Sequence, residues 1–140
     1  MSRKDEIFLF DILVAILKIE EVSKKFDNSQ DLLYSFTDWD SVIREFEIIG
    51  EATKHLINKN ILSKEYRAIV DFRNLIIHKY FGIDEEIIWN IIHKELPKFK
   101  KTILKLIIKI EPNLKKQLIN SFLEDNKHLD FITKKLKEIQ

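Results

Sequence analysis

Apolar residues recur at steps of three and four along most of the chain, the period that places them on one face of an α-helix. No segment is typical of a strand, in which apolar and polar residues alternate. The pattern therefore predicts an all-α protein, with a short helical turn over 30–36. The longer helices are expected over residues 4–25, 38–58, 84–110, 113–124 and 127–139. One further helix is expected to begin after Ser63.

Polar residues that commonly cap helices mark several of the expected boundaries. Thr37 or Asp38 is expected to begin the second helix, and Asp84 the fourth. Pro97 has no backbone N–H, so it either kinks the fourth helix or begins the next one in its first turn.

The helices are expected to form one domain, because 140 residues suit a single hydrophobic core. Residues 1–110 are predicted to form an antiparallel helical bundle of the four-helix up-and-down type. After the break at Glu111-Pro112-Asn113, residues 111–140 are predicted to be a C-terminal helical extension of the same domain. With only two glycines and two prolines, the composition favours helices over a sandwich or barrel.

Charge is divided unevenly along the chain, although the formal net charge is only +1. Residues 1–50 carry 6 Lys and Arg against 11 Asp and Glu, whereas residues 51–140 carry 18 against 12. The net charge argues against a protein that coats nucleic acid without selectivity. The second half can still present a local basic surface.

The chain has no cysteine, which excludes disulfides and thiolate zinc sites. No metal ion and no cofactor are expected. The N-terminal residues carry charges of both signs, unlike a signal peptide, and the apolar runs are too short to cross a bilayer. These features predict a cytoplasmic protein without a membrane partner.

Four polar residues that can do chemistry lie within eight positions of an otherwise apolar helical segment: Arg73, Asn74, His78 and Tyr80. Each residue of an α-helix turns the chain by about 100°. Arg73 and Tyr80 therefore lie on nearly the same face, whereas Arg73 and His78 diverge by about 140°. Arg73 and His78 can act on one ligand only if the ligand bridges them or a second copy of the helix completes the site.

An arginine, a histidine and a tyrosine are suited to cleaving RNA without a metal ion. A guanidinium binds a phosphate through two hydrogen bonds, and an imidazole transfers protons near neutral pH. RNA carries its own nucleophile, the 2′-hydroxyl, so internal transesterification needs little more than a base and a cation. The spacing alone leaves open a structural histidine beside a surface arginine.

The stretch Arg73-Asn74-Leu75-Ile76-Ile77-His78-Lys79-Tyr80 resembles the signature of HepT-like toxins, in which four residues separate Arg from His and one separates His from Tyr. These toxins belong to the HEPN superfamily of helical ribonucleases. The resemblance extends over roughly residues 5–110. It is carried further by Leu9 to Ile19, Ile48-Ile49-Gly50-Glu51-Ala52, Tyr80-Phe81-Gly82-Ile83-Asp84, Trp89 and Leu96-Pro97.

The resemblance implies an all-helical homodimer whose motif helices meet near the twofold axis and form a composite site. It implies that His78 is the general base or acid, that Arg73 binds the phosphate and that Asn74 supports them. Tyr80 corresponds to the tyrosine to which a partner antitoxin, a minimal nucleotidyltransferase, attaches AMP. The implied function is a metal-independent endoribonuclease toxin of a type VII-like toxin–antitoxin system.

Two points stay open from the sequence. The lysines Lys98, Lys101 and Lys105 lie on one face of a helix and are either an RNA-binding track or an ordinary solvated face. The alternative function is a non-catalytic HEPN helical binding partner of a nucleotidyltransferase, in which Arg73 and His78 hold the dimer or a nucleotide.

Overall fold

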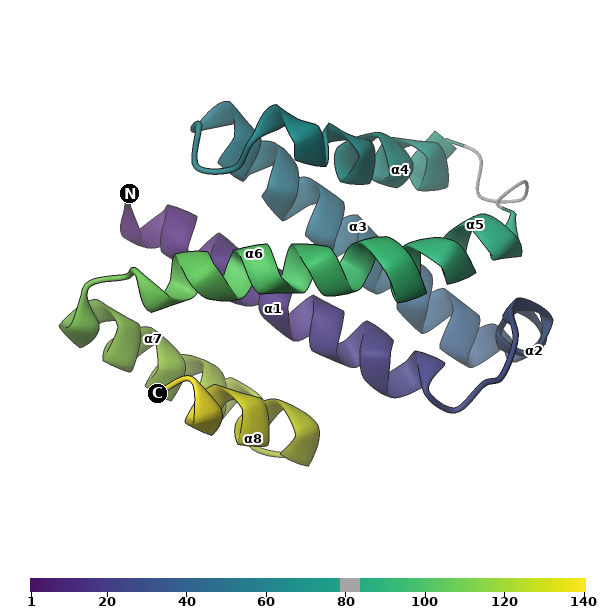
Figure 1. The fold of residues 1–140 in the computed structure, drawn as a ribbon. Helices are drawn as coiled ribbons and strands as arrows, with labels where there is room; N and C mark the ends of the chain where they lie inside the picture. The colour runs from purple at the N-terminus through teal and green to yellow at the C-terminus, as the bar shows by residue number, and fades with distance from the viewer. Residues whose placement is uncertain (79–83) are drawn as a thin grey trace.

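The structure, a computed structural model, describes the backbone of residues 1–78 and 84–140 and the side chains of the same residues except 73–78. All regular elements in these residues are helical, so the predicted all-α fold is confirmed. The longest helices of the bundle run antiparallel to their neighbours along the chain (Figure 1): α1 (Arg3–Ser23), α3 (Phe36–Asn58), α4 (Arg67–His78) and α6 (Leu96–Ile108).

Further elements connect and extend this bundle: α2 (Ser29–Tyr34), the 3₁₀ turn η1 (Lys64–Tyr66), α5 (Glu85–Asn90), the π-helical turn η3 (Ile91–Glu95), α7 (Pro112–Asp125) and α8 (Asp130–Glu138). The connecting helix α2 packs against α3 and α5, and the Ser29 hydroxyl donates a hydrogen bond to the Glu86 carboxylate between α2 and α5.

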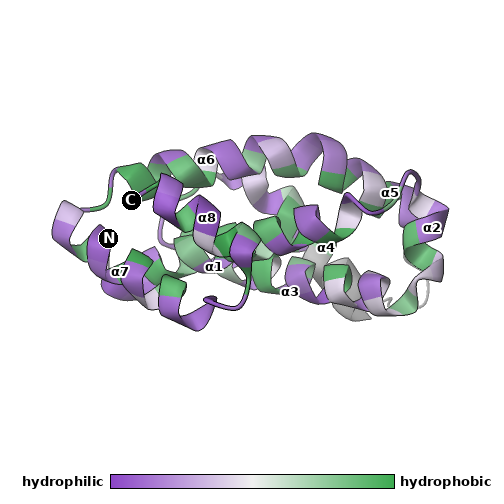
Figure 2. Ribbon diagram, turned by 90° about the horizontal axis from the view of Figure 1, so that it is seen from below, coloured by the Kyte–Doolittle hydropathy of each residue, from purple (hydrophilic) through white to green (hydrophobic). Residues whose placement is uncertain are grey.

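Helix α1 lies at the centre of the hydrophobic core. It contacts α3, α6 and α8, and residues on nearly all of its faces are buried, including the whole run from Ile12 to Leu17. An α-helix that is apolar over most of its circumference is stable only when other helices surround it. Hydrophobic residues accordingly gather on the facing sides of the helices and hydrophilic residues on the outer sides (Figure 2).

The expected helix boundaries are partly confirmed. Asp84 caps α5 by accepting a hydrogen bond from the Glu86 N–H at 2.8 Å. The expectation that Thr37 or Asp38 begins the second helix is wrong, because α3 begins at Phe36 directly after Ser35. Ser35 ends α2 as well as preceding α3, and its carbonyl accepts the Trp39 N–H at 2.8 Å. Ser35 alone therefore connects α2 to α3, and Thr37 and Asp38 lie inside α3.

Pro97 lies in the first turn of α6, which is one of the two positions expected for it. The preceding turn, η3, is a π-helix, the kind of local widening that bends a continuous helix. The segment from Glu85 to Ile108 is therefore one helical path with a change of pitch before Pro97.

Residues beyond 110 pack onto the bundle through α7 and α8. The ring of Phe122 on α7 stacks on Phe10 of α1, with the ring centroids 5.2 Å apart. Both helices contribute completely buried side chains to the core: Leu118, Ile119, Ile132 and Leu136.

Candidate functional site

Helix α4 carries three of the predicted site residues. Arg73 and Asn74 lie in its second half, and His78 is its last residue. The backbone is α-helical throughout this stretch, so the divergence of about 140° between positions 73 and 78 applies to it. The side chains of Arg73, Asn74 and His78 lie outside the described residues, as does all of Tyr80.

Aromatic packing holds the first half of α4 on α3. Phe72, which directly precedes Arg73, meets Phe46 of α3 edge to face, with ring centroids 5.2 Å apart and an interplanar angle of 82°. Phe72 is 7% exposed and Val70 2%, so this face of α4 is part of the core. Such rigid packing fixes the backbone that carries the predicted motif.

The start of α4 is tied to α6 through Tyr66. The Tyr66 hydroxyl and the Thr102 hydroxyl lie within hydrogen-bonding distance, at 2.8 Å. The Tyr66 ring also packs on Phe99, with centroids 5.1 Å apart. Ser63 stabilises the turn that presents Tyr66, because its hydroxyl accepts the Glu65 N–H.

A cavity of about 290 Å³ lies between these two aromatic contacts, with α4 on one side and η3 and α6 on the other. No pattern in the sequence predicted it, because its aromatic residues have the same helical period as ordinary core residues. It is lined by Phe46, Glu65, Tyr66, Ala68, Ile69, Phe72, Ile91, Glu95, Leu96, Lys98 and Phe99.

Exposed lysines follow the outer face of η3 and α6. We call this set the lysine stripe: Lys94, Lys98, Lys101, Lys105 and Lys109. Within the described part of the chain, no carboxylate forms an ion pair with Lys98, Lys101 or Lys105. Lys100 lies off the stripe and is paired with Glu20 of α1 at 2.8 Å. Lys98 both belongs to the stripe and lines the cavity.

A second, open groove lies between α1 and α3, with a volume of about 460 Å³. It is lined by Asp11 of α1 and by Ile48, Glu51 and Ala52 of α3, among others. The fold thus brings together two blocks of sequence that resemble the HepT-like pattern. Burial raises the pKa of Asp11 above its ordinary value.

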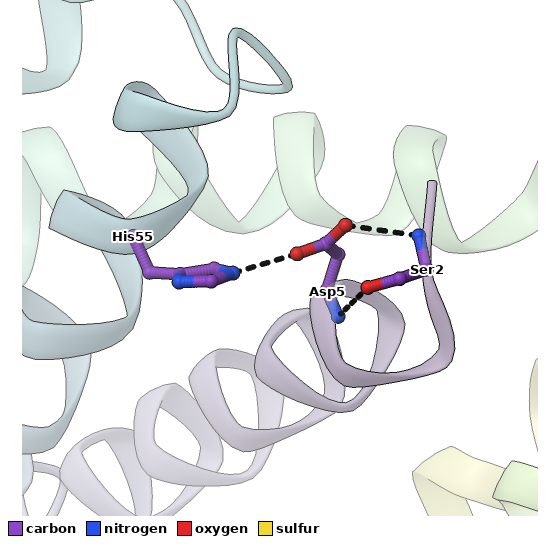
Figure 3. Close-up of polar contacts among 3 residues, drawn as sticks. All are labelled: Ser2, Asp5 and His55. Atoms are coloured by element: carbon purple, nitrogen blue, oxygen red, sulfur yellow. Dashed lines mark hydrogen bonds and ion pairs between the residues drawn. The ribbon is translucent and has the colours of Figure 1, made fainter.

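His55 forms a polar contact that joins the two ends of the first hairpin (Figure 3). Its Nε2 lies 2.6 Å from Asp5 Oδ1, and Asp5 also accepts the Ser2 N–H at 2.9 Å. The hydrogen bonds from His55 and then Ser2 hold the pKa of Asp5 well below its usual range. Fifty residues separate His55 from Asp5, and no local pattern predicts such a pair.

The described residues contain no group of three or more His, Cys, Asp or Glu side chains placed to hold a metal ion. In the same part of the chain, no helix is long and apolar enough to cross a bilayer.

Comparison with known proteins gives a family and several relatives. The family described as "Ribonuclease HepT-like" matches residues 12–106, which is more than half of the chain. "Putative RNase MJ1380" of Methanocaldococcus jannaschii is 36% identical over 107 residues, which cover 74% of this chain and 97% of that protein. "Probable ribonuclease HepT" of Thermococcus cleftensis is 35% identical over 109 residues, covering 76% and 98%.

A longer relative matches over only part of its length. "Gamma-glutamylcyclotransferase and putative RNase MJ0434" of Methanocaldococcus jannaschii is 36% identical over 115 residues, which cover 79% of this chain and 51% of that protein. No solved structure matches the chain significantly.

Proposed function

This chain belongs to the HepT-like ribonuclease family, and we propose that it is a metal-independent endoribonuclease that acts as the toxin of a toxin–antitoxin pair. The observation that carries the proposal is the family match, whose span of residues 12–106 includes the complete motif Arg73, Asn74, His78 and Tyr80. The name of the Thermococcus cleftensis relative, a probable ribonuclease HepT, supports RNA as the substrate.

The proposed reaction is internal transesterification. A base takes the proton from a ribose 2′-hydroxyl, and the 2′-oxygen then bonds to the adjacent phosphorus. His78 is proposed as the general base of this step or as the general acid of the next. The bond from phosphorus to the 5′-oxygen breaks, and that oxygen leaves with a proton from the site or from water. The products are a 2′,3′-cyclic phosphate and a 5′-hydroxyl. Arg73 binds the phosphate and stabilises the charge that builds on it, and Asn74 orients the phosphate or the histidine.

The site is proposed to be shared by two copies of the chain. On one α-helix, positions 73 and 78 diverge by about 140°, which is unsuited to a single phosphate. In a homodimer with twofold symmetry, Arg73 of one motif helix can lie beside His78 of the other.

Tyr80 is proposed as the regulatory position. A partner nucleotidyltransferase antitoxin would attach AMP to its hydroxyl, with release of pyrophosphate from ATP. The added phosphate and its bulk, two residues from His78, would repel and exclude the RNA.

The proposal also covers domain organisation, location and RNA binding outside the motif. Residues 1–110 and the helical extension 111–140 are proposed to form one domain, and the protein is proposed to work in the cytoplasm. The exposed lysines Lys98, Lys101 and Lys105 bind RNA phosphates, since none of them forms an ion pair with a described carboxylate.

Cleavage of a defined RNA in the presence of excess EDTA tests the proposed activity. The wild-type protein should cleave, and His78→Ala should not. His128→Ala is the matched control, because His128 is exposed and lies outside the family match. Cleavage that persists in His78→Ala would remove His78 from the mechanism, and a wild-type protein that is inactive would favour the non-catalytic alternative.

A further inference from the structure

The cavity between α4 and α6 is shaped by aromatic rings. Two ring pairs line it: Phe46 with Phe72, and Tyr66 with Phe99. Its volume of about 290 Å³ is near the lower limit for a small-molecule site. Phe46, Phe72 and Phe99 are at most 7% exposed, whereas the Tyr66 ring is half-buried. Tyr66 therefore offers the accessible aromatic face of the cavity, on which a flat ligand can stack.

The polar residues that line the cavity give a second indication of the kind of ligand it can bind. Glu65, Glu95 and Lys98 are exposed side chains that line it, so charged groups surround its mouth. Lys98 is also part of the lysine stripe, which continues on η3 before it and on α6 after it. A positively charged track that passes an aromatic cavity is the arrangement by which proteins bind single-stranded nucleic acid.

We propose that this cavity binds one unpaired base of the RNA substrate while the flanking phosphates lie along the lysine stripe. The inference rests on the proposed ribonuclease function and adds a subsite to it. Phe72 lines the cavity and directly precedes Arg73, so the base subsite and the proposed phosphate-binding residue share α4.

The chemistry of the lining favours particular bases. The carboxylates of Glu65 and Glu95 accept hydrogen bonds, as an exocyclic amino group requires. Adenine, cytosine and guanine carry such a group and uracil does not. Double-stranded RNA is excluded, because its bases are stacked and paired and cannot enter the cavity.

Binding to two uncleavable probes tests the inference. One is a 2′-O-methylated octanucleotide containing adenine and cytosine, and the other is an octamer of abasic units with the same number of phosphates. Neither has a free 2′-hydroxyl, so affinity is measured without cleavage. The wild-type protein should bind the probe with bases at least about tenfold more tightly, the difference expected from stacking one base.

Two substitutions of Tyr66 separate its ring from its hydroxyl. Tyr66→Leu removes the ring and should abolish most of the preference for the probe with bases. Tyr66→Phe keeps the ring and should retain the preference, although both variants lose the hydrogen bond to Thr102. Ala68→Leu narrows the cavity from an exposed position on α4, and it should reduce the preference without disturbing the core.

Lysine substitutions test the phosphate track separately. Lys98→Ala should weaken binding of both probes by a similar factor, and Lys134→Ala, an exposed lysine on α8, should change neither.

Three results would overturn the base subsite. The first is equal binding of both probes by the wild-type protein, and the second is an unchanged preference in both folded Tyr66→Leu and Ala68→Leu. The third is a change of oligomeric state in these variants with no change in base preference, which would assign the cavity to a second copy of the chain. Cleavage of RNA by the wild-type protein is a separate measurement and can persist in all three cases. Failure of the base subsite would therefore leave the proposed ribonuclease function intact.

Discussion

Phe72 meets Phe46 edge to face, with the ring centroids 5.2 Å apart. This contact joins α4 to α3 at the residue directly before Arg73. The proposed catalytic residues therefore follow a point at which the backbone is fixed by the core. Their placement depends on packing as much as on the motif itself.

Phe72→Leu should destabilise the protein and lower the proposed activity together. The loss of the aromatic pair and part of the ring volume should reduce the free energy of unfolding by about 1–2 kcal/mol. Urea unfolding followed by circular dichroism measures this, with Phe36→Leu as the control, because Phe36 is 73% exposed. Equal effects of the two substitutions would mean that the contact does not anchor α4.

Asp5→Asn should destabilise the protein at pH 6 by about 1 kcal/mol, the typical net value of an intramolecular hydrogen bond. The folded state holds the pKa of Asp5 below its ordinary value, so it favours the carboxylate more than the unfolded chain does. The stabilisation is therefore present above pH of about 4 and is lost as the pH falls further.

The difference in unfolding free energy between wild type and Asp5→Asn, measured from pH 6 to 3, checks this dependence. Asp27→Asn serves as the control, because Asp27 is an exposed carboxylate. A difference that grows toward low pH would contradict the role given to the contact between Asp5 and His55.

Ile132→Ala in α8 should lower the stability of the whole bundle. Ile132 is completely buried, and truncation of such a residue costs about 2–5 kcal/mol. If residues 111–140 belong to the same domain, the variant should unfold in one cooperative transition at a lower urea concentration. Thr133→Ala, at the neighbouring half-exposed position, is the control. Two separate transitions would show that the extension folds as an independent unit.

Each lysine of the proposed RNA track should contribute to the salt dependence of binding. Lys98→Ala, Lys101→Ala and Lys105→Ala should each reduce the slope of log affinity against log salt by about 0.7 for single-stranded RNA. Fluorescence anisotropy at several salt concentrations gives these slopes, and Lys134→Ala is the control. Unchanged slopes in all three variants would leave the stripe as a solvated helix face.

The helices were predictable from sequence because their apolar period is local information. The cap at Asp84 was predictable for the same reason. The single-residue connection at Ser35 was not, since Ser35, Thr37 and Asp38 are all residue types that cap helices and the local pattern does not choose among them. The pairing of His55 with Asp5 depends on residues far apart in the chain, and no periodicity indicates it.

The candidate site also has one part that the sequence predicted and one part that it did not. The motif from Arg73 to Tyr80 was visible as a short stretch with a family resemblance, and the family match now covers it. The cavity beside it was not visible, because Tyr66, Phe72 and Phe99 have the spacing of core residues. Only the three-dimensional arrangement separates aromatic residues that line a cavity from those that fill the core.

Mixing two inactive variants tests the central claim most directly. Arg73→Ala and His78→Ala should each fail to cleave RNA in EDTA. In an equimolar mixture that exchanges subunits, half of the dimers are mixed, and each mixed dimer holds one complete site. The mixture should then recover about a quarter of the wild-type activity. Full cleavage by either variant alone, or no recovery in a mixture shown to contain mixed dimers, would contradict a ribonuclease site shared between two copies of α4.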